Sequence, residues 1–286
     1  MAEGRELSGR FIVVTGANTG IGRAAAEQLA RGGAMVVLAC RSQSRTQPVV
    51  DAIRARGGET RFISLDLGDL ESVRAAAAQI RDLGRPVDVL VNNAGVAGHR
   101  GITKDGFELA FGTNHVGHFL LTMLLAPSLR AAVRARIVNV SSQAHYAAKG
   151  IDFQAVRSVT KTFTGLTEYA VSKLANVLFT RELARRMGPG GVHSYALHPG
   201  VVASDAWRRV PWPIRPLMKM RMISNEEGAK TTLHCATSPE VADDSGRYYD
   251  ACREKEPSPL AQDEKLAGAL WQRSVEWTGA DLESSH

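Results

Sequence analysis

Cysteine is scarce in this sequence: Cys40, Cys235 and Cys252 are the only three in 286 residues. Three thiols cannot form the disulfide framework of a small secreted protein, so we expect them to be reduced. Long apolar runs are also missing, and no segment approaches the roughly 20 residues that cross a bilayer. Residues 1–9 form a polar tail without a signal-like apolar stretch. These absences predict a cytoplasmic protein with no transmembrane segment.

Clusters of like charge are absent as well. The formal net charge is +6, but the basic residues are scattered, and no aromatic-interleaved basic stretch accompanies them. Proteins that bind nucleic acid usually gather such residues on one face, so we predict no nucleic-acid partner. The sequence also has no internal repeat, low-complexity tract or linker that would divide it. We therefore predict a single domain over residues 1–286, with an anionic ligand to explain part of the positive charge.

Strand-like and helix-like segments alternate along the chain. The apolar, β-branched run at residues 11–14 is typical of a buried strand, and residues 23–31 are typical of a helix. Further strand-like runs occupy residues 34–39, 61–65 and 87–91. This alternation predicts an α/β fold of Rossmann type, a doubly wound parallel sheet with helices on both faces.

A glycine-rich turn joins the first strand to the first helix. Its glycines are spaced Gly-x-x-x-Gly-x-Gly. Glycine allows the backbone to approach a phosphate closely, and the N-terminus of a helix offers free N–H groups and the positive end of its dipole. The alternative is a glycine-rich loop without a ligand. We predict a cradle for dinucleotide phosphates made by Gly16, Asn18, Thr19, Gly20, Ile21 and Gly22.

Tyr169 and Lys173 lie four residues apart in a helix-like run. Positions i and i+4 share one face of a helix, so an ammonium group would lie beside a phenol. A free tyrosine has a pKa of about 10, and a nearby positive charge lowers it. Such a pair can exchange a proton near neutral pH. The alternative is an ordinary surface pair, which is common at this spacing.

Four other motifs accompany these two in a fixed order: Asp66-Leu67, Asn92-Asn93-Ala94-Gly95, Val138-Asn139-Val140-Ser141-Ser142 and His198-Pro199-Gly200. With them, residues 9–252 resemble the short-chain dehydrogenase/reductase family. Two sequence segments, Gly-Ala-Asn-Thr-Gly-Ile-Gly and Thr-Asn-His-Val-Gly-His-Phe, are most similar to the retinol-dehydrogenase-like branch of that family. The resemblance implies an oxidoreductase of CH–OH or C=O groups. It also implies a homo-oligomer, a dimer or tetramer, formed through the helix after Asn114 and the helix that carries Tyr169.

The end of the second strand indicates the cofactor. Enzymes of this fold that bind NAD place an acidic residue there, which bonds the ribose hydroxyl. Here Cys40 takes that position and Arg41 follows. A guanidinium binds a 2′-phosphate through forked, charge-assisted hydrogen bonds, so we predict NADP(H). Arg23 and Arg45 are candidate helpers, although an ordinary surface position would also explain each of the three arginines.

The resemblance assigns further cofactor contacts. Asp66 would meet the adenine amino group, and Asn93 would help to seat the adenosine half. The backbone of Val202 would bond the carboxamide, and Ser204 keeps a hydroxyl where the family usually has threonine. Besides the glycine-rich turn, the expected cofactor-binding residues are Arg41, Asp66, Leu67, Asn93, Ala94, Gly95, Tyr169, Lys173, Pro199, Gly200, Val202 and Ser204.

The resemblance also implies a catalytic group. Tyr169 would donate a proton to the carbonyl oxygen as the cofactor delivers a hydride to carbon. Lys173 would lower the pKa of the phenol and bond the nicotinamide ribose. Ser142 would hold the substrate oxygen and stabilise its developing charge, and Asn114 would hold a water that links Lys173 to solvent. Ser141 is the alternative to Ser142, which we favour because the family's serine is usually the second of such a pair.

Residues 203–222 combine aromatic, methionine, proline and basic side chains. Aromatic and thioether groups provide a large, adaptable apolar surface. We therefore predict a substrate lid, with Trp207 and Trp212 as substrate contacts in addition to Ser142 and Tyr169. A packed loop and a peripheral membrane contact are the alternatives.

Residues 253–286 form a C-terminal extension that is more polar than the rest. We expect a short amphipathic helix near residues 263–277 and a frayed end from residue 279 onward. His115 and His118 lie three residues apart on one helix, but no further ligands stand at matching spacing. We therefore predict structural roles for both histidines and no metal site.

These observations favour an NADPH-dependent carbonyl reductase, or alcohol dehydrogenase, that acts on a bulky hydrophobic ketone or alcohol. A polycyclic, polyketide, steroid or retinoid-like compound would fit. The alternative is an NADP(H)-binding protein without turnover, which would serve as a redox sensor or interaction partner. The presence of Asn114, Ser142, Tyr169 and Lys173 together favours the enzyme.

Overall fold

A central eight-stranded sheet organises the chain, of which the computed structural model describes residues 6–200 and 223–282. The strands lie in the order β3-β2-β1-β4-β5-β6-β7-β8; neighbours are parallel except the antiparallel pair β7 and β8. This confirms the predicted doubly wound α/β fold. The strands are β1 (Phe11–Thr15), β2 (Met35–Cys40), β3 (Thr60–Ser64), β4 (Val89–Asn92), β5 (Ala135–Val140), β6 (Val192–His198), β7 (Arg247–Asp250) and β8 (Arg253–Glu254).

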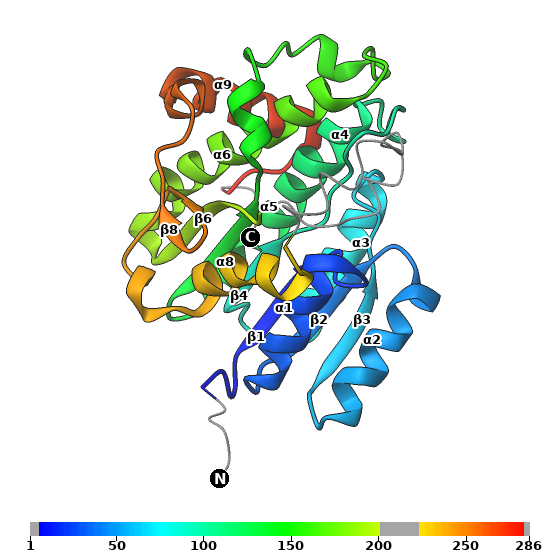
Figure 1. Cartoon of the computed structure of the whole chain (residues 1–286), viewed down its shortest axis with the longest axis vertical. Helices are drawn as coiled ribbons and strands as arrows, with labels where there is room; N and C mark the ends of the chain where they lie inside the picture. The colour runs from blue at the N-terminus through cyan, green and yellow to red at the C-terminus, as the bar shows by residue number, and fades with distance from the viewer. Residues whose placement is uncertain (1–5, 201–222, 283–286) are drawn as a thin grey trace.

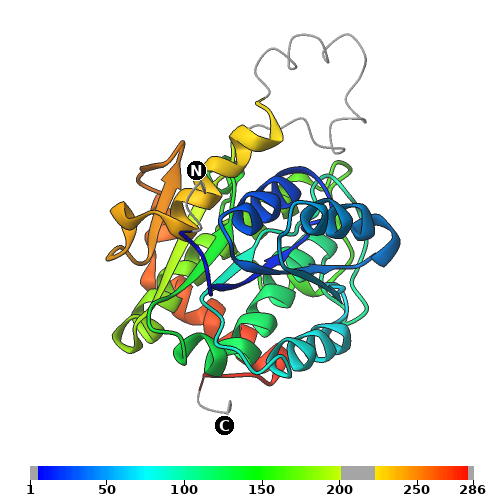
Figure 2. The same ribbon diagram turned by 90° about the horizontal axis from the view of Figure 1, so that it is seen from below.

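Helices cover both faces of the sheet (Figures 1 and 2). The α-helices are α1 (Gly20–Arg31), α2 (Gln43–Ala55), α3 (Leu70–Arg81), α4 (Leu109–Phe111), α5 (Gly117–Arg130), α6 (Leu166–Met187), α8 (Asn225–Thr237) and α9 (Glu264–Thr278). Short 3-10 turns occupy Gln143–Ala147, Ala155–Arg157, Gly188–Gly190, Pro239–Val241 and Pro259–Gln262. A π-helical segment, Gly112–Val116, joins α4 to α5.

The central strand β1 shows why its sequence is continuously apolar. Successive side chains of a strand point to opposite faces, so a strand covered on both sides needs apolar residues throughout. Phe11 and Val13 pack in the core with α3, α5 and α6, whereas Ile12 and Val14 pack in the core with α1, α2 and α8.

The strand order reverses between β1 and β4. In open α/β sheets, ligands bind at such a switch point, outside the carboxyl ends of the strands. The segments that leave the sheet there are the glycine-rich turn after Thr15 and the Asn93–Gly95 loop after Asn92. The fold therefore brings two of the sequence motifs together at one edge.

The C-terminal extension is packed onto the sheet's helices. The ring of Trp271, on α9, lies 5.2 Å from the ring of Phe119 on α5 and 6.0 Å from that of Phe179 on α6. The predicted helix is thus confirmed. The predicted frayed end is wrong for residues 279–282, because Ala280 and Leu282 are buried against the same core.

In the parts of the chain that the structure describes, one helical stretch, Leu109–Arg130, is long and apolar enough by length and composition to cross a membrane. The expectation that no segment approaches this length is therefore wrong. However, 83% of its apolar window is buried inside the fold, as in the core helix of a soluble protein. Its apolar character is explained by burial between the sheet and the neighbouring helices.

Candidate active site

The glycine-rich turn is closed tightly against the loop after β4. Gly16 and Gly20 have φ angles of +66° and +59°, the left-handed region that favours glycine. A Cβ on Gly22 would lie 2.3 Å from the amide nitrogen of Asn93 and 2.5 Å from the carbonyl oxygen of Gly16. Any side chain at Gly22 would therefore force the two loops apart.

The N-terminus of α1 is left open by the sequence. Its N-cap residue, Thr19, makes no side-chain capping hydrogen bond, and the first turn contains no acidic side chain. The free N–H groups and the positive end of the helix dipole remain available for an anion. Gly16, Asn18, Thr19, Gly20 and Ile21 all keep solvent exposure, so these residues fit a dinucleotide pyrophosphate.

Thr15 holds the second loop in place. Its hydroxyl accepts hydrogen bonds from the backbone N–H groups of Asn93 and Ala94, both at 3.0 Å, and bonds the Nε2 atom of His118 at 2.9 Å. The Asn93 amide in turn donates to the Thr15 carbonyl at 2.8 Å. The sequence did not reveal Thr15 and His118 as site residues.

His118 connects this loop to Asn114. Its Nδ1 atom bonds the Asn114 carbonyl at 3.0 Å. A carbonyl only accepts, so Nδ1 carries the proton and Nε2 accepts from the Thr15 hydroxyl. Burial lowers the pKa of His118 to about 4, the bond to Asn114 opposes this, and the charge of Lys173 adds to it. A neutral imidazole therefore links the two loops at neutral pH.

Asn114 clamps the segment after Gly95. Its side-chain oxygen accepts from the N–H of Val96 at 2.8 Å, and its nitrogen donates to the Val96 carbonyl at 3.0 Å and to the Ser172 hydroxyl at 2.9 Å. A Cβ on Gly95 would lie 3.2 Å from the Asn114 oxygen and 3.6 Å from Nζ of Lys173. Gly95, Asn114 and Lys173 therefore converge.

Lys173 is buried and points into the site. Its Nζ donates to the Val140 carbonyl at 2.8 Å and lies 5.5 Å from the centre of the Tyr169 ring. Burial lowers the pKa of Lys173 to about 8. Burial raises the pKa of Tyr169, while a hydrogen bond with Ser142 lowers it. The predicted lowering of the phenol pKa is therefore wrong for this structure, because the loss of water around the phenol outweighs its polar neighbours.

The two serines after β5 have different partners. Ser141 is buried, and its hydroxyl donates to the Lys173 carbonyl at 2.7 Å, which ties β5 to α6. The Ser142 hydroxyl bonds Tyr169 and accepts from the N–H of Ala144 at 3.2 Å. Of the two candidates, the structure brings Ser142 to the tyrosine.

His145 supports this serine from behind. The fully buried imidazole bonds the Ser142 carbonyl through Nδ1 at 2.7 Å and accepts from the N–H of Ser258 through Nε2 at 3.1 Å. The C-terminal extension is thereby linked to the site, a contact that the sequence did not reveal. His198 similarly accepts from the N–H of Gln143, at 3.4 Å.

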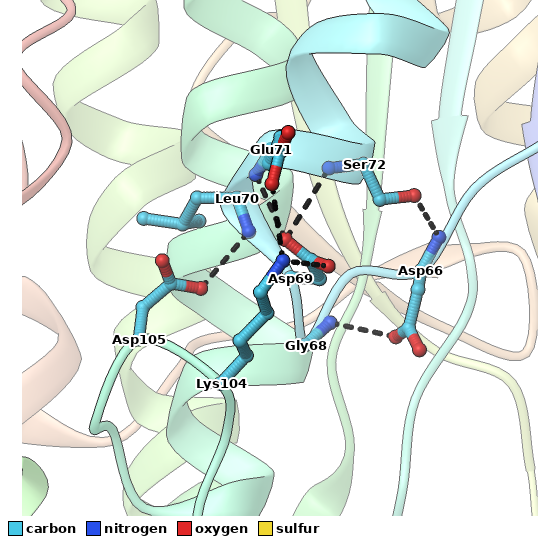
Figure 3. Close-up of polar contacts among 8 residues, drawn as sticks. All are labelled: Asp66, Gly68, Asp69, Leu70, Glu71, Ser72, Lys104 and Asp105. Atoms are coloured by element: carbon cyan, nitrogen blue, oxygen red, sulfur yellow. Dashed lines mark hydrogen bonds and ion pairs between the residues drawn. The ribbon is translucent and has the colours of Figure 1, made fainter.

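Asp66 follows the carboxyl end of β3, which is parallel to β2 and β1, and Figure 3 shows its contacts with Gly68 and Ser72. The Asp66 carboxylate accepts from the N–H of Gly68 at 2.9 Å, and its N–H donates to the Ser72 hydroxyl at 2.9 Å. Leu67 is buried, and a Cβ on Gly117 would lie 2.4 Å from its carbonyl oxygen. The loop is therefore packed directly on the start of α5.

Charged side chains fasten this loop from outside (Figure 3). Lys104 donates to Asp69 at 2.8 Å and to Glu71 at 3.1 Å, and Asp105 accepts from the N–H of Leu70 at 2.9 Å. The hydrogen bond with Lys104 lowers the pKa of Asp69. The start of α3 is thus capped both by its own residues and by the loop before α4.

The end of β2 carries no carboxylate. Cys40 is buried, and burial raises the pKa of its thiol. Arg41 is exposed, and no residue in the part of the chain that the structure describes bonds its guanidinium. Arg23 is engaged with Glu27 at 2.7 Å, which supports a surface role for it.

The last predicted cofactor contacts follow β6. Gly200 has a φ of +84°, and a Cβ there would lie 2.4 Å from Cδ1 of Ile223. Pro199 precedes it at the end of the strand. Val202, Ser204 and the predicted lid at 203–222, with Trp207 and Trp212, lie outside the residues that the structure describes.

The buried histidines of the helix after Phe111 have protein partners. His115 bonds the Ser274 hydroxyl at 3.0 Å through Nε2 and packs among the rings of Phe111, Phe119 and Phe179. Its position between α5, α6 and α9 is that of a core side chain.

Comparison with known proteins identifies the class. The model of the short chain dehydrogenase family matches residues 10–212, and the chain belongs to this family. It is therefore an oxidoreductase of alcohol or carbonyl groups that binds a nicotinamide cofactor, NAD or NADP. The predicted resemblance is confirmed.

Individual relatives are similar over almost the whole chain. Human (Homo sapiens) retinol dehydrogenase 13 is 40% identical, over 97% of this chain and 87% of that protein. Human retinol dehydrogenase 12 is 42% identical over 97% and 89%. A protein of Mycobacterium Paratuberculosis with no assigned function has a similar structure, with a TM-score of 0.79, 32% identity and 96% coverage of both chains. A protein from Beutenbergia cavernae, named as an NAD(P)-dependent gluconate 5-dehydrogenase and crystallised with NADP, gives a TM-score of 0.71 at 29% identity, over 86% of this chain and 96% of that one.

These relatives correct the predicted location. Retinol dehydrogenases 12, 13 and 14 are membrane-associated enzymes, and they are about 40% identical to this chain. The expectation of a cytoplasmic protein, which was based on few cysteines and missing apolar runs, is therefore wrong.

Proposed function

We propose that the protein is an NADPH-dependent carbonyl reductase, equivalently an alcohol dehydrogenase, for a bulky hydrophobic ketone or alcohol. The observation that carries this proposal is the convergence of Ser142, Tyr169 and Lys173 beside the loop that Asn114 clamps. Ser142 follows β5, Tyr169 and Lys173 lie on α6, and Asn114 belongs to the π-helical segment. A chance surface pair of tyrosine and lysine would lack both the burial and the serine.

The cofactor proposal rests on the two glycine-dependent loops and on Arg41. The open N-terminus of α1 would hold the pyrophosphate, Asp66 would meet the adenine, and Arg41 would bind the 2′-phosphate. The absence of a carboxylate at the end of β2 favours NADP(H) over NAD(H). When bound, the nicotinamide supplies the hydride of the reaction.

The protein's own residues handle the proton. The Ser142 hydroxyl would hold the substrate oxygen, and the phenol of Tyr169 would donate its proton to that oxygen. A raised phenol pKa keeps the proton in place at neutral pH, as a donor requires. Once the proton leaves, the Lys173 ammonium beside the ring would stabilise the phenolate. Asn114 would hold the water that reconnects Lys173 to solvent.

The substrate class is proposed from the relatives and the sequence. Several relatives are named retinol dehydrogenases, and retinol is a long apolar alcohol. Trp207 and Trp212 would provide apolar substrate contacts beside Ser142 and Tyr169. A polycyclic, steroid, polyketide or retinoid-like ketone would suit such a surface better than a sugar.

The reaction is tested by following the absorbance of NADPH with aromatic, polycyclic and retinoid-like carbonyl compounds. Tyr169→Phe should lower kcat by about a hundredfold to ten-thousandfold, because it removes the proton donor. It should leave NADPH binding detectable by fluorescence. Tyr146→Phe, which removes an exposed hydroxyl bonded to the Glu256 carbonyl, is the matched control. Equal activity in Tyr169→Phe and wild type contradicts the mechanism. No turnover with any carbonyl compound, together with tight NADPH binding, favours a sensor.

Cofactor choice is tested separately. Arg41→Ala should raise the Kd for NADPH by roughly tenfold to a hundredfold, the loss expected for one charge-assisted contact. The Kd for NADH should change little, because NADH lacks the 2′-phosphate. Arg31→Ala, at the far end of α1, controls for loss of positive charge. An equal effect on both cofactors would assign Arg41 to the surface.

A further inference from the structure

Four apolar side chains are exposed together on one surface. Ile102, Val159, Phe163 and Leu166 have relative exposures of 50%, 55%, 89% and 55%, and we call them the rim patch. They are four of the six large hydrophobic residues that are exposed in the described part of the chain. Such gathering is unusual for a surface that faces only water.

Backbone contacts hold the two segments of the rim patch side by side near α4 (Figure 1). The N–H of Thr160 donates to the Gly101 carbonyl at 3.2 Å, and the N–H of Gly101 donates to the Thr160 hydroxyl at 3.0 Å. A Cβ on Gly165 would lie 2.8 Å from the carbonyl oxygen of His99. Residues 98–102 and 159–166 therefore form one surface rather than two separate tips.

Positive charge accompanies the rim patch. Arg100 and Lys161 are exposed beside it, and neither forms an ion pair with any residue that the structure describes. The nearby Glu168 carboxylate is taken up by the backbone of the same loop, where it accepts from the N–H groups of Lys161 at 3.0 Å and Thr162 at 2.8 Å. The side chains of Arg100 and Lys161 are left without an acidic partner among the described residues. Segments 97–104 and 149–168 together contain the bases Arg100, Lys104, Lys149, Arg157 and Lys161 and the acids Asp152 and Glu168.

The rim patch borders the candidate active site. Leu166 is the first residue of α6, and Tyr169 lies in the first turn of the same helix. The other segment continues directly from the Gly95–Val96 loop, which Asn114 clamps beside Lys173. Whatever covers the rim patch therefore lies next to the two segments that lead to Tyr169 and to the Gly95 loop beside Lys173.

We propose that the rim patch docks on an anionic phospholipid bilayer. Phe163 and its neighbours would leave water for the headgroup–acyl boundary, where aromatic and aliphatic side chains are favourable. Arg100 and Lys161 would face the lipid phosphates, and each basic residue near such a surface strengthens binding. A second copy of the chain is a poorer occupant, because a symmetric contact would bring the same cations together.

The bilayer then becomes the source of the substrate. Large apolar ketones and alcohols partition into membranes, so a site whose flanking segments rest on the bilayer would receive them without passage through water. This consequence rests on the proposed function. Vesicle binding itself requires neither cofactor nor turnover.

The test is co-flotation of the full chain with phosphatidylcholine vesicles, with and without phosphatidylserine. Wild type should float with the anionic vesicles, and high salt should weaken this binding. Lys161→Gln should reduce the partition coefficient about fivefold, the factor for one surface cation. The double variant Phe163→Ser/Leu166→Ser should reduce it further. Matched controls are Val133→Ser, an apolar side chain that is 91% exposed before β5, and Lys265→Gln on α9.

Three results would overturn the proposal. The first is a wild-type protein that does not float with the anionic vesicles. The second is equal flotation of wild type and the double variant. The third is a fall in the partition coefficient of Val133→Ser that equals the fall in the double variant. If a second copy covers the rim patch instead, sedimentation velocity will show a dimer that the double variant dissociates, with no vesicle binding. NADPH binding by each variant confirms folding, and its failure in wild type would count against the proposed function alone.

Discussion

At the residue scale, the site depends on a lysine that is held in an unfavourable environment. The pKa of Lys173 falls from 10.5 to about 8 because the ammonium is buried. The unfolded chain therefore binds a proton more readily than the folded chain between these values, and the folded state is penalised at lower pH. A charge kept at this cost is consistent with a catalytic role rather than a structural one.

Lys173→Met should consequently make the protein more stable and abolish carbonyl reduction. At pH 7 the free energy of unfolding should rise by up to about 3 kcal/mol, and the gain should shrink as the pH approaches 10.5. The Val140 carbonyl keeps a hydrogen bond from the Asn176 amide at 3.2 Å, so the substitution leaves no orphaned acceptor there. Urea unfolding across this pH range measures the effect, with exposed Lys265→Met as control. A pH-independent difference would contradict the explanation.

At the scale of elements, the π-helical segment and α5 bring two neutral histidines into the core. Burial lowers the pKa of His115 to about 3 and that of His118 to about 4. Electrostatic repulsion also lowers both pKa values: protonation of His115 is opposed by a proton on His118, and protonation of His118 is opposed by the Lys173 ammonium. Because the folded pKa values lie below the unfolded value, the unfolded chain takes up protons first as the pH falls.

Stability should therefore decline between about pH 6.5 and pH 4, with each histidine contributing about 3 kcal/mol at the acid end. His115→Leu should remove roughly 3 kcal/mol of this decline, since its Nδ1 atom has no partner among the described residues and aromatic rings surround it. Denaturant titrations at several pH values measure this, and the exposed His99→Leu serves as the control. If His115→Leu and wild type lose stability in parallel, the origin of the acid sensitivity lies elsewhere.

At the scale of the whole molecule, the sequence predicted those features that depend on local patterns, such as the alternation of strands and helices. The glycine-rich turn, the strand at residues 11–14 and the sheet architecture follow from periodicity and turn chemistry, and the structure agrees with them. Tyr169 and Lys173 are adjacent on α6 because helical spacing alone places them there.

The remaining features depend on contacts between distant residues. Thr15 meets His118, 103 positions later, and His145 meets Ser258, 113 positions later. A single hydrogen bond at such a separation leaves no periodic trace in the sequence. The predicted direction of the Tyr169 pKa shift was wrong for a related reason. The shift depends on how deeply the phenol is buried, and burial depends on the complete fold.

Assembly also belongs to the scale of the whole molecule. The predicted homo-oligomer was assigned to the helix after Asn114 and the helix of Tyr169, and it stays a prediction. On those helices, α9 already covers Phe119 and Phe179 with Trp271. Part of the expected contact face is therefore occupied within one chain, which any dimer through α5 and α6 must accommodate.

The bond from Ser258 to His145 makes the C-terminal extension a support of the Ser142 backbone. Exchanging tails between related enzymes, or fusing a bulky tag close to Pro257, would disturb turnover even though the nucleotide-binding half is untouched. The extension is therefore part of the folded body that holds residues 142–145 in place, and not a free appendage.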